Sequence, residues 1–344
     1  MRASRLMSIA ASAALLVAMA GCAQSSDAPG NGSAAPAGAT DAFPVTVQHA
    51  FGETTIERKP TRVATVAWAN HEVPLALGVV PVGMSRATWG DDDGDGVLPW
   101  VEDRLTELGA KTPVLFDETD GIDFEAVADT RPDVILAAYS GLSKSDYETL
   151  SKIAPTIAYP KTAWGTTLDE MIEMDSEAIG LGEEGEQLEE RVDAQVEQAA
   201  TKRPQLEGKS AMFAYIDPAD LSKVGFYTTL DPRARLFEDL GMTTPQAVEQ
   251  ASGASKEFYL TVSAEDAASL DDVDVIVTYG DAALLKKLQA DPLLGKIPAI
   301  ARGSVVLLTD STPLAASANP SPLSVGAASD DYLDALAAAA DRVG

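Results

Sequence analysis

The chain has 344 residues, and its 53 acidic residues against 25 Lys and Arg give a formal charge of −28 at pH 7. A negative field of this size repels nucleic acid and anionic lipid headgroups, so composition argues against both as partners. The single cysteine excludes an intramolecular disulfide, and two histidines are too few for a His-rich zinc or manganese site. The fold must therefore be held together by its core.

The N-terminus has the pattern of a secretory signal. Two arginines and no acid precede the apolar run Leu6–Ala20, and Gly21 and Cys22 follow it. Such a run is shorter than the ~20 apolar residues that span a membrane as a helix. We therefore expect residues 1–21 to be a signal peptide and the protein to be exported.

The lone cysteine stands at the expected cleavage site. Met19–Cys22 resembles a bacterial lipobox, in which the cysteine is lipidated and becomes the new N-terminus; cleavage without lipidation is the alternative. Residues 23–42 consist mostly of Ser, Ala, Gly and Pro, a composition typical of a flexible linker. We expect residues 22–42 to anchor the protein to the outer face of the cytoplasmic membrane.

The rest of the chain alternates between strand and helix patterns. Phe43–Glu57 predicts a β-hairpin that turns at Phe51 and Gly52. Short apolar runs predict strands at 63–67, 79–83, 133–138, 156–159, 210–216, 273–279 and 303–309. Helical spacing predicts helices at 70–78 with Asn70 as the cap, at 123–129, across 166–200 and at 330–343. Nearly continuous apolar strands between helices indicate parallel sheets that are covered on both faces.

The two halves of the chain also resemble each other. Asp123–Asp129 has an early glutamate and leads into an Asp-Val-Ile strand, and Ser263–Ser269 does the same. We predict an α/β fold of two Rossmann-like lobes with mainly parallel sheets, bridged by one long helix. The expected parts are an N-terminal lobe over 43–163, an interlobe helical segment over 164–204 and a C-terminal lobe over 205–344 that includes the final helix. Ligands of parallel sheets bind at the carboxyl ends of strands, which places the site in the cleft between the lobes.

Six segments in this order and spacing resemble one family. They are Phe43–Ile56, Lys59–Val63, Leu77–Gly83, Pro132–Gly141, Lys152–Thr156 and Asp231–Gly241. The chain from Phe43 onward resembles the substrate-binding proteins of ABC importers for ferric siderophores, heme and cobalamin, and above all the siderophore-binding lipoproteins of Gram-positive bacteria. The resemblance implies a protein that is not an enzyme and has no cofactor. It would capture a ferric siderophore outside the membrane and deliver it to a permease dimer with its ATPase for iron uptake, with heme or cobalamin as the alternative ligand.

The resemblance also implies a docking device. In this family one surface glutamate near the top of each lobe pairs with arginines of the permease. By position these glutamates are Glu72 and Glu238, with Asp239 as an alternative to Glu238. Exposed ion pairs contribute little energy singly, but two pairs that are far apart on a rigid body fix its orientation.

A ferric siderophore requires aromatic faces for stacking, and cationic or hydroxyl donors for its chelate oxygens. Residues of these types lie near the ends of the predicted strands. The ligand-binding residues that we expect are Trp68, Arg86, Trp89, Tyr139, Trp164, Tyr215, Tyr227, Arg233 and Tyr279. Core packing is the alternative for the tryptophans, and a bond to Asp231 is the alternative for Arg233. These few basic residues favour an anionic or polar chelate over a bare metal ion.

An acidic loop offers a competing chemistry. Asp91, Asp93, Asp95 and Glu102 fit the spacing of a calcium-binding loop, with Gly96 at the sharp turn. No helix is predicted before this loop, and a solvated acidic loop is the alternative.

Catalysis is the competing class of function. The chain has no H-E-x-x-H, G-x-S-x-G or Walker A pattern and no pairing of a histidine with a nucleophile. An exported enzyme that uses a carboxylate pair is the remaining alternative, but no pair is marked by the sequence.

Overall fold

The computed structural model describes residues 43–327 and 329–343. The predicted signal peptide, Cys22 and the linker therefore lie outside the described residues. Within the described residues, no helix is both long enough and apolar enough to cross a bilayer.

The described chain opens with a two-stranded hairpin, as predicted. β1 (Val45–His49) pairs with β2 (Gly52–Ile56) in antiparallel register. Gly52 has a φ of +125°, a backbone conformation that favours glycine. The hairpin is fixed to the rest of the molecule by Thr54, whose hydroxyl donates to the Thr156 carbonyl oxygen at 2.8 Å.

The first sheet is entirely parallel. Its strands are β3 (Val63–Thr65), β4 (Gly83–Ser85), β5 (Val114–Phe116), β6 (Val134–Leu136) and β7 (Thr156–Ile157), in the order β5-β4-β3-β6-β7. The helices that connect them are α1 (Glu72–Ala76), α2 (Pro99–Glu107), α3 (Phe124–Asp129) and α4 (Lys144–Leu150). Alternate residues of β6 enter separate apolar clusters, Val134 and Leu136 in one and Ile135 in the other. Both faces of the sheet are therefore covered, which explains its nearly continuous apolar strands.

The second sheet is mixed. Its strands are β8 (Ala211–Tyr215), β9 (Lys223–Tyr227), β10 (Tyr259–Ser263), β11 (Val275–Tyr279) and β12 (Val305–Leu308), in the order β10-β9-β8-β11-β12. β8, β11 and β12 are parallel, whereas β9 is antiparallel to both of its neighbours. In chain order, the first to fifth strands occupy the same places in both sheets. The resemblance between the two halves is thus a resemblance of topology.

Helices cover the second sheet and complete the chain. They are α7 (Pro232–Asp239), α8 (Gln246–Ala254), α9 (Ala282–Ala290), α10 (Pro298–Arg302), α11 (Pro313–Ser317), α12 (Ser324–Ala327) and α13 (Ser329–Ala340), with 3-10 turns η1 (Pro204–Leu206), η2 (Ala264–Leu270) and η3 (Leu294–Lys296). The predicted final helix corresponds to α13. Its buried residues Leu333 and Leu336 pack into the same cluster as Phe213 of β8.

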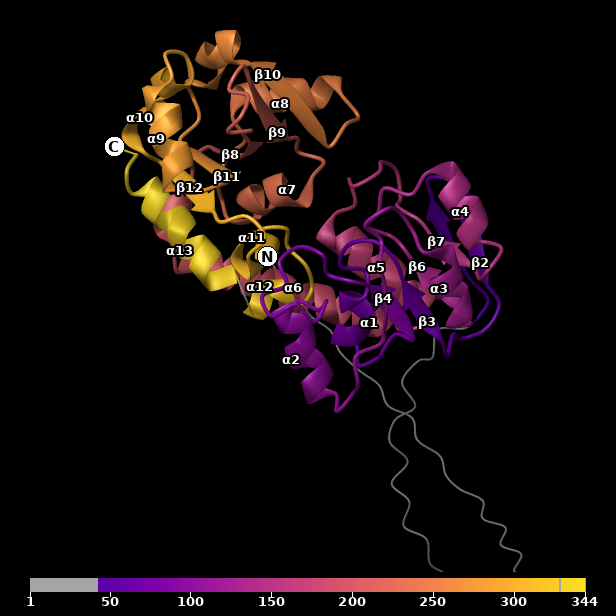
Figure 1. Ribbon diagram of the computed structural model, residues 1–344. Coiled ribbons are helices and arrows are strands. Elements are labelled where there is room, and N and C mark those ends of the chain that lie inside the picture. The colour runs from indigo at the N-terminus through magenta and orange to yellow at the C-terminus, as the bar shows by residue number, and fades with distance from the viewer. Residues whose placement is uncertain (1–42, 328, 344) are drawn as a thin grey trace, which may run out of the picture. The chain divides into compact units, whose positions relative to one another are not determined.

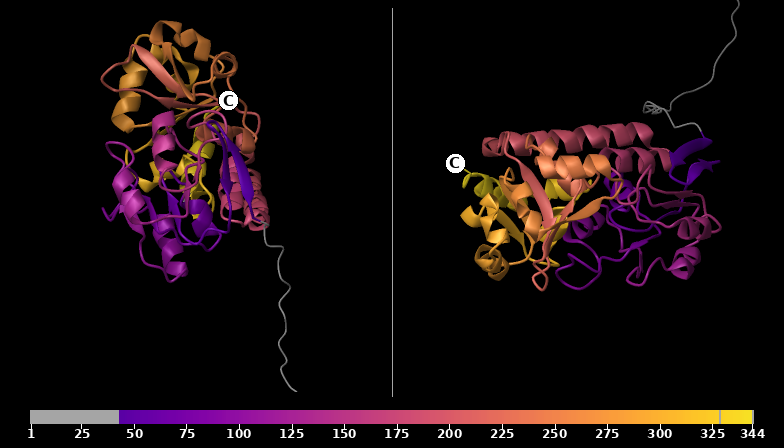
Figure 2. Two further views of the ribbon diagram at one scale, coloured as in Figure 1. Left: turned by 90° about the vertical axis from the view of Figure 1, so that its right-hand side faces the viewer. Right: turned by 90° about the horizontal axis from the view of Figure 1, so that it is seen from above.

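Two helices connect the sheets along the chain, as predicted from the missing strand signal. α5 (Leu168–Ala178) begins with a capping box between Thr167 and Glu170, and α6 (Gly182–Thr201) continues for 20 residues. Figures 1 and 2 show α6 running along one side of both α/β lobes. The lobes are thus bridged by one long helix, with both sheets on the same side of it.

Some expected details are wrong. Asn70 does not cap a helix: its buried side-chain amide donates to the carbonyl oxygens of Val66 and Tyr139, and α1 begins only at Glu72. The strand expected to begin within 79–83 is β4, which starts only at Gly83 and ends at Ser85. The preceding segment contains Pro81, which lacks the N–H that a ladder requires.

Strands β5, β9 and β10 and helix α2 had no clear signal in the sequence. β5 is only three residues long, and β9 contains Gly225, where an added Cβ would lie 1.7 Å from the Tyr259 hydroxyl oxygen. That glycine is required by close packing between β9 and β10, but in a sequence it weakens a strand pattern.

Candidate functional site

A cavity of about 430 Å³ lies at the carboxyl ends of the first sheet's strands. Trp68 follows β3, Arg86 follows β4 and Glu118 follows β5, while Trp164 comes from the loop before α5. Parallel strands bring the residues after their carboxyl ends to one edge of the sheet, so residues far apart in sequence meet there. Trp68, Arg86 and Trp164 are therefore gathered as predicted.

Glu118 is the residue of this cavity that the sequence did not indicate. Its carboxylate accepts a hydrogen bond from the Ala67 N–H, with Oε2 2.9 Å from the nitrogen. Burial raises the pKa of Glu118 to about 7, although the hydrogen bonds from Ala67 and Ser85 act in the opposite direction. Nothing in the sequence singles out this acid among 53, because the strand before it was not recognised.

A second cavity, of about 630 Å³, lies at the carboxyl ends of the second sheet's parallel strands. Tyr215 ends β8, Tyr279 ends β11, and Asp310 lies two residues beyond β12. Tyr215 is 47% exposed, so its ring is available to a ligand. Both predicted tyrosines thus line this cavity.

Trp89 joins the two cavities. Its ring centroid lies 6.2 Å from that of Trp68 in the first cavity and 5.4 Å from that of Tyr279 in the second. The indole Nε1 donates to Asp310 Oδ1 at 3.0 Å. Next to it, Gly90 packs so closely on Ala316 that an added Cβ would lie 2.5 Å from the alanine Cβ. The loop after β4 therefore crosses to the second lobe, and Trp89 lies between the two cavities, which we together call the cleft.

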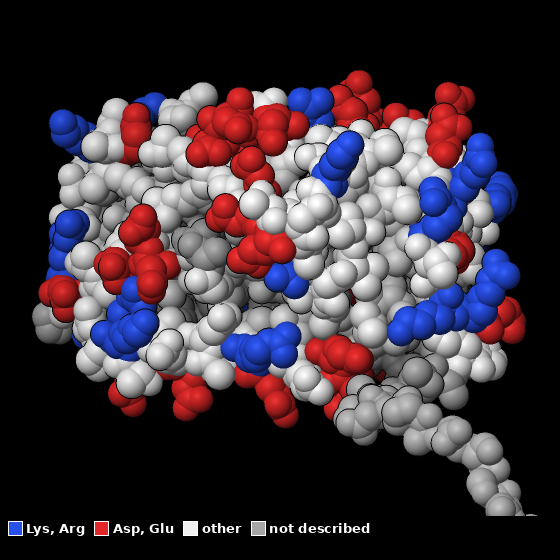
Figure 3. Space-filling model, turned by 90° about the horizontal axis from the view of Figure 1, so that it is seen from below, with Lys and Arg blue, Asp and Glu red and all other residues white. Residues whose placement is uncertain are grey.

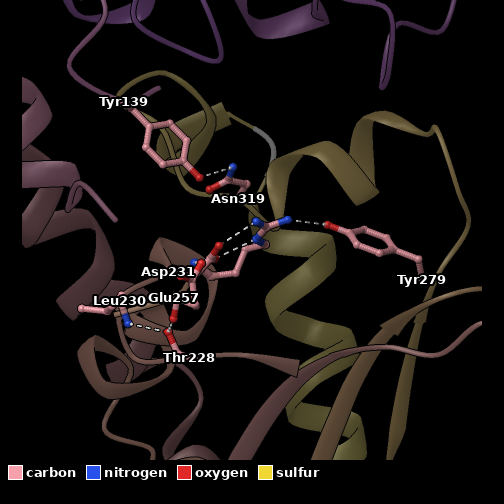
Figure 4. Close-up of polar contacts among 8 residues, drawn as sticks. Tyr139, Thr228, Leu230, Asp231, Glu257, Tyr279 and Asn319 are labelled. Carbon is pink, nitrogen blue, oxygen red and sulfur yellow. Dashed lines mark hydrogen bonds and ion pairs between the residues drawn. The ribbon is translucent and has the colours of Figure 1, made fainter. Parts of the chain in front are cut away.

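Arg233 lies in a polar cluster at the second lobe, part of which is shown in Figure 4. Its guanidinium binds the buried Asp231 carboxylate through two nitrogens, at 2.8 and 2.7 Å. The guanidinium carbon lies 3.7 Å from the Tyr227 ring centroid, within the range of a cation–π contact, and Nη1 donates to the Tyr279 hydroxyl at 3.4 Å. Burial acts to lower the pKa of Arg233, but the charge of Asp231, the hydrogen bonds that it accepts from Arg233 and the neighbouring Tyr139 and Tyr279 together raise this pKa well above its ordinary value. Burial also raises the pKa of Tyr227 to about 12.

This cluster shows that Arg233 does pair with Asp231, the alternative considered from the sequence. The Arg233 side chain is 13% exposed and that of Asp231 is fully buried. The pair carries no net charge. Arg233 therefore offers hydrogen-bond donors held in a fixed geometry rather than a free positive charge.

Tyr139 does not line either cavity. It is 3% exposed, its hydroxyl accepts a hydrogen bond from Asn319 Nδ2 at 3.2 Å, and its ring packs edge-on against Trp164 at 5.4 Å. Burial raises its pKa. Figure 4 shows Tyr139 and Asn319 facing each other from different parts of the chain. The prediction of Tyr139 as a ligand contact is therefore wrong, because its side chain is buried behind Trp164, which lines the first cavity.

Glu72 is not a surface residue. It is fully buried: Oε1 accepts from Trp100 Nε1 at 2.9 Å, and Oε2 accepts from the Leu323 N–H at 3.0 Å. Burial raises the pKa of Glu72 to about 7 against the effect of these hydrogen bonds. The docking role expected for Glu72 is wrong, since this carboxyl group instead fixes the segment before α12 to α1. Glu238, by contrast, is exposed and accepts from the Thr244 hydroxyl at 2.8 Å.

The acidic loop folds on itself. Carboxylate oxygens of Asp91, Asp93 and Asp95 lie within 4.8 Å of one another, and Glu102 lies in the first turn of α2. Asp91 accepts from the N–H groups of Gly94 and Gly96 at 2.8 and 2.7 Å. These hydrogen bonds hold the loop in shape, in keeping with the solvated acidic loop that was the alternative to calcium binding.

A family model described as "Periplasmic binding protein" matches residues 63–312. The chain belongs to this family. Among solved structures, PiaA of Streptococcus pneumoniae TIGR4 in complex with ferrichrome is 46% identical, with a TM-score of 0.84 over 87% of this chain and 99% of that one. Among curated proteins, a probable siderophore-binding lipoprotein of Bacillus subtilis, YfiY, is 25% identical over 68% of this chain and 67% of its own length. The ferric enterobactin-binding periplasmic protein FepB of Escherichia coli O6:H1 is 25% identical over 78% of this chain and 85% of its own.

These comparisons confirm the predicted family and fold. A family of binding proteins also fits the prediction that the chain is not an enzyme. The charge on the face shown in Figure 3 agrees with a solvated surface, since acidic groups and basic groups alternate there with neutral side chains.

Proposed function

We propose that this binding protein captures a ferric siderophore in the cleft and delivers it to an ABC permease for iron uptake. The observation that carries the proposal is the pair of cavities at the carboxyl ends of two sheets, joined by Trp89 and lined by aromatic rings. A relative that shares 46% of its residues has been solved with ferrichrome, a ferric siderophore, and that complex supports the same ligand class here.

The cleft suits a bulky chelate rather than a bare ion. Trp68, Trp164 and Tyr215 offer aromatic faces to the organic shell of the ligand. Arg86 is exposed, and its charge is available to chelate oxygens. Arg233 donates to Tyr279 and packs on the Tyr227 ring, and Tyr279 lines the second cavity, so this ring is held in place before a ligand binds.

We assign permease docking to a different glutamate pair from that expected. Glu125 is the second residue of α3, Glu265 is the second residue of η2, and both are exposed. α3 connects the third and fourth strands of the first sheet and η2 connects those of the second, so the two glutamates are topologically equivalent. Both follow a strand's carboxyl end, at the edge of each sheet that borders the cleft. Glu72 and Glu238 lie in connections that do not correspond.

Delivery requires the protein to remain near its permease. A lipid at Cys22 and a linker of about 20 residues would confine it there and raise the effective concentration of the two partners. A Cys22→Ala protein should bind ligand with unchanged affinity and be released from the cells into the medium. Retention of that variant on the cells would show that Cys22 does not anchor the protein.

The ligand is tested by tryptophan-fluorescence titration with ferric siderophores of several classes, heme and cobalamin. We expect saturable quenching by a ferric siderophore, because Trp68, Trp89 and Trp164 line or join the cavities. Quenching by heme or cobalamin alone would reject the siderophore. Absence of binding by all ligands would reject the proposed function.

Docking is tested in cells with the double variant Glu125→Ala and Glu265→Ala. Iron uptake should be lost while the isolated protein keeps its ligand affinity. Glu238→Ala is the matched control, because it removes an exposed glutamate outside the equivalent pair. Loss of uptake in the control, with uptake intact in the double variant, would restore Glu238 as the docking residue.

A further inference from the structure

Acidic residues outnumber basic residues in both halves of the cleft. The ionisable residues that line the cavities are Asp217, Asp281, Lys287 and Asp310 on one side and Arg86, Glu118 and Asp146 on the other. Five acids against two bases give a formal charge of −3, and the Arg233 charge is cancelled by Asp231. A cleft of this charge repels an anionic ligand and tolerates an uncharged or cationic one.

The four aspartates of this set are engaged with other groups. Asp217 and Asp281 accept backbone N–H groups two residues further along the chain, and Asp281 caps α9. Asp146 completes the capping box of α4, and Asp310 accepts from the Trp89 indole. These carboxylates hold their own loops in place, so their positions are fixed by structure as much as by a ligand.

Glu118 is held in a different way. Its partners are the Ser85 side chain and the N–H of Ala67; Ala67 has a φ of 62°, and Ala69 has a φ of 61°. Non-glycine residues are strained in this region of backbone space, and such strain persists only where the surroundings fix it. The two strained alanines flank Trp68, which lines the same cavity. Glu118 therefore fixes the loop that presents the Trp68 ring.

The environment also sets the charge of Glu118. Burial raises its pKa to about 7, so a substantial fraction of the carboxyl groups holds a proton at neutral pH. A protonated carboxyl group donates a hydrogen bond, whereas a carboxylate only accepts. The other ionisable groups that line this cavity are Arg86 and Asp146.

We propose that Glu118 is a specificity-determining residue, which selects uncharged or cationic ferric chelates over anionic ones and in its protonated form donates a hydrogen bond to a chelate oxygen. This inference rests on the proposed function. Hydroxamate groups carry one negative charge each, so three of them neutralise Fe³⁺. Catecholate groups carry two each, so a ferric tricatecholate is strongly anionic. The ligand class assigned to the cleft is therefore the ferric trihydroxamates.

The test compares three variants with the parent protein. Glu118→Gln removes the charge and keeps an oxygen that can accept from the Ala67 N–H. Glu118→Ala removes the acceptor as well. Asp120→Asn makes the same change of charge two residues away, at an exposed side chain that does not line the cavity. Each protein is titrated with an uncharged ferric trihydroxamate and with a ferric tricatecholate at pH 6 and pH 8, and its thermal unfolding is recorded.

We expect the parent to prefer the trihydroxamate. A unit charge about 10 Å away, at an effective dielectric constant of about 20, corresponds to roughly tenfold in affinity. Glu118→Gln should therefore strengthen tricatecholate binding about tenfold or more at pH 8, while Asp120→Asn changes it less than about twofold because solvent screens its charge. Trihydroxamate affinity of the parent should fall from pH 6 to pH 8, and that of Glu118→Gln should not. Glu118→Ala should bind both ligands more weakly than Glu118→Gln, because both variants lack the charge but only Glu118→Ala leaves the Trp68 loop without its anchor.

Three results would overturn the proposal. One is a parent protein that binds the tricatecholate more tightly than the trihydroxamate. Another is a Glu118→Gln protein whose ligand preference and pH profile match those of the parent. The third is an Asp120→Asn protein that changes as much as Glu118→Gln. Absence of binding by every ferric chelate is a distinct outcome: it rejects the proposed function, and this inference with it.

Discussion

The two lobes that form the cleft have the same strand order, but they differ in whether their ionisable side chains form ion pairs. In the second lobe, Arg233 and Asp231 neutralise each other, and both Tyr227 and Tyr279 contact the guanidinium. In the first lobe, Glu118 forms no ion pair with any described residue, and it holds a strained loop through a backbone N–H. In the second lobe the arginine charge is thus paired within the protein before a ligand binds. In the first lobe Glu118 has no ion-pair partner, so a ligand can change its protonation.

The comparison suggests a division of labour. A neutral, cross-braced cluster supplies a rigid surface, and rigidity reduces the entropy lost when a ligand binds. The half-buried Glu118, which has no ion-pair partner among the described residues, supplies discrimination, because its interaction with a ligand depends on the charge of both. The same strand order therefore supports a rigid binding surface in one lobe and ligand discrimination in the other. The difference lies in which ionisable side chains follow each strand.

Removal of Arg233 should have the largest effect on the second lobe. Arg233→Ala would leave Asp231 buried without its partner, which costs about 3–5 kcal/mol of unfolding free energy. Urea denaturation measures the change, and Arg235→Ala, an exposed arginine on the same helix, is the control. A loss below about 1 kcal/mol would show that solvent already reaches Asp231, and the two halves would then differ less than we argue.

The buried Glu72 should make stability depend on pH. Its pKa in the folded protein, about 7, lies above the ordinary value of 4.5, so its protonated form is favoured by folding. The stabilisation of the folded protein by protonated Glu72 is complete below about pH 4.5. It is lost as the pH rises through about 7, by roughly 3 kcal/mol of unfolding free energy in total. Glu72→Gln should remove this dependence, so the unfolding free energy of the variant should rise relative to that of the parent between pH 5 and pH 8.

Urea denaturation of both proteins across this pH range measures the difference, and Glu57→Gln, an exposed glutamate, is the control. A difference between parent and Glu72→Gln that stays constant with pH would mean that Glu72 is ionised throughout. The segment before α12 would then be held by a charge rather than by a neutral carboxyl group.

Loss of the Trp89 hydrogen bond should have the smallest of these effects, since the ring contacts with Trp68 and Tyr279 can remain. Trp89→Phe keeps an aromatic ring near Trp68 and Tyr279 but loses the bond to Asp310. We expect a loss of about 1 kcal/mol in unfolding free energy and faster release of the ligand. Asp310→Asn, which keeps an acceptor oxygen, is the matched control. An unchanged release rate in Trp89→Phe would show that the lobes are held together without this contact.

The sequence predicted the architecture well where apolar strands are continuous. β6 and β11 are buried on both faces, and their Val and Ile residues leave no other interpretation. It failed where a strand is short or contains glycine, as in β5 and β9, because tertiary packing determines those strands. The resemblance between Asp123–Asp129 and Ser263–Ser269 was visible in the sequence, and the topology explains it.

The cleft was predictable only in part. Residues after recognised strands, such as Trp68 and Tyr279, were found because the carboxyl edge of a parallel sheet is a general rule. Burial of Glu72 and Tyr139 could not be foreseen, since it depends on the segment around Asn319 and Leu323, far away in the sequence. Glu118 was not predicted because it follows β5, which is too short to be recognised in the sequence.

The most direct test of the account is a crystal structure of the protein with a ferric trihydroxamate bound. We predict that the chelate lies between the two cavities, with its organic shell against Trp68 and Tyr215 and a chelate oxygen within hydrogen-bond distance of Glu118 or Arg233. A chelate bound elsewhere on the surface, with both cavities holding only solvent, would contradict the central claim.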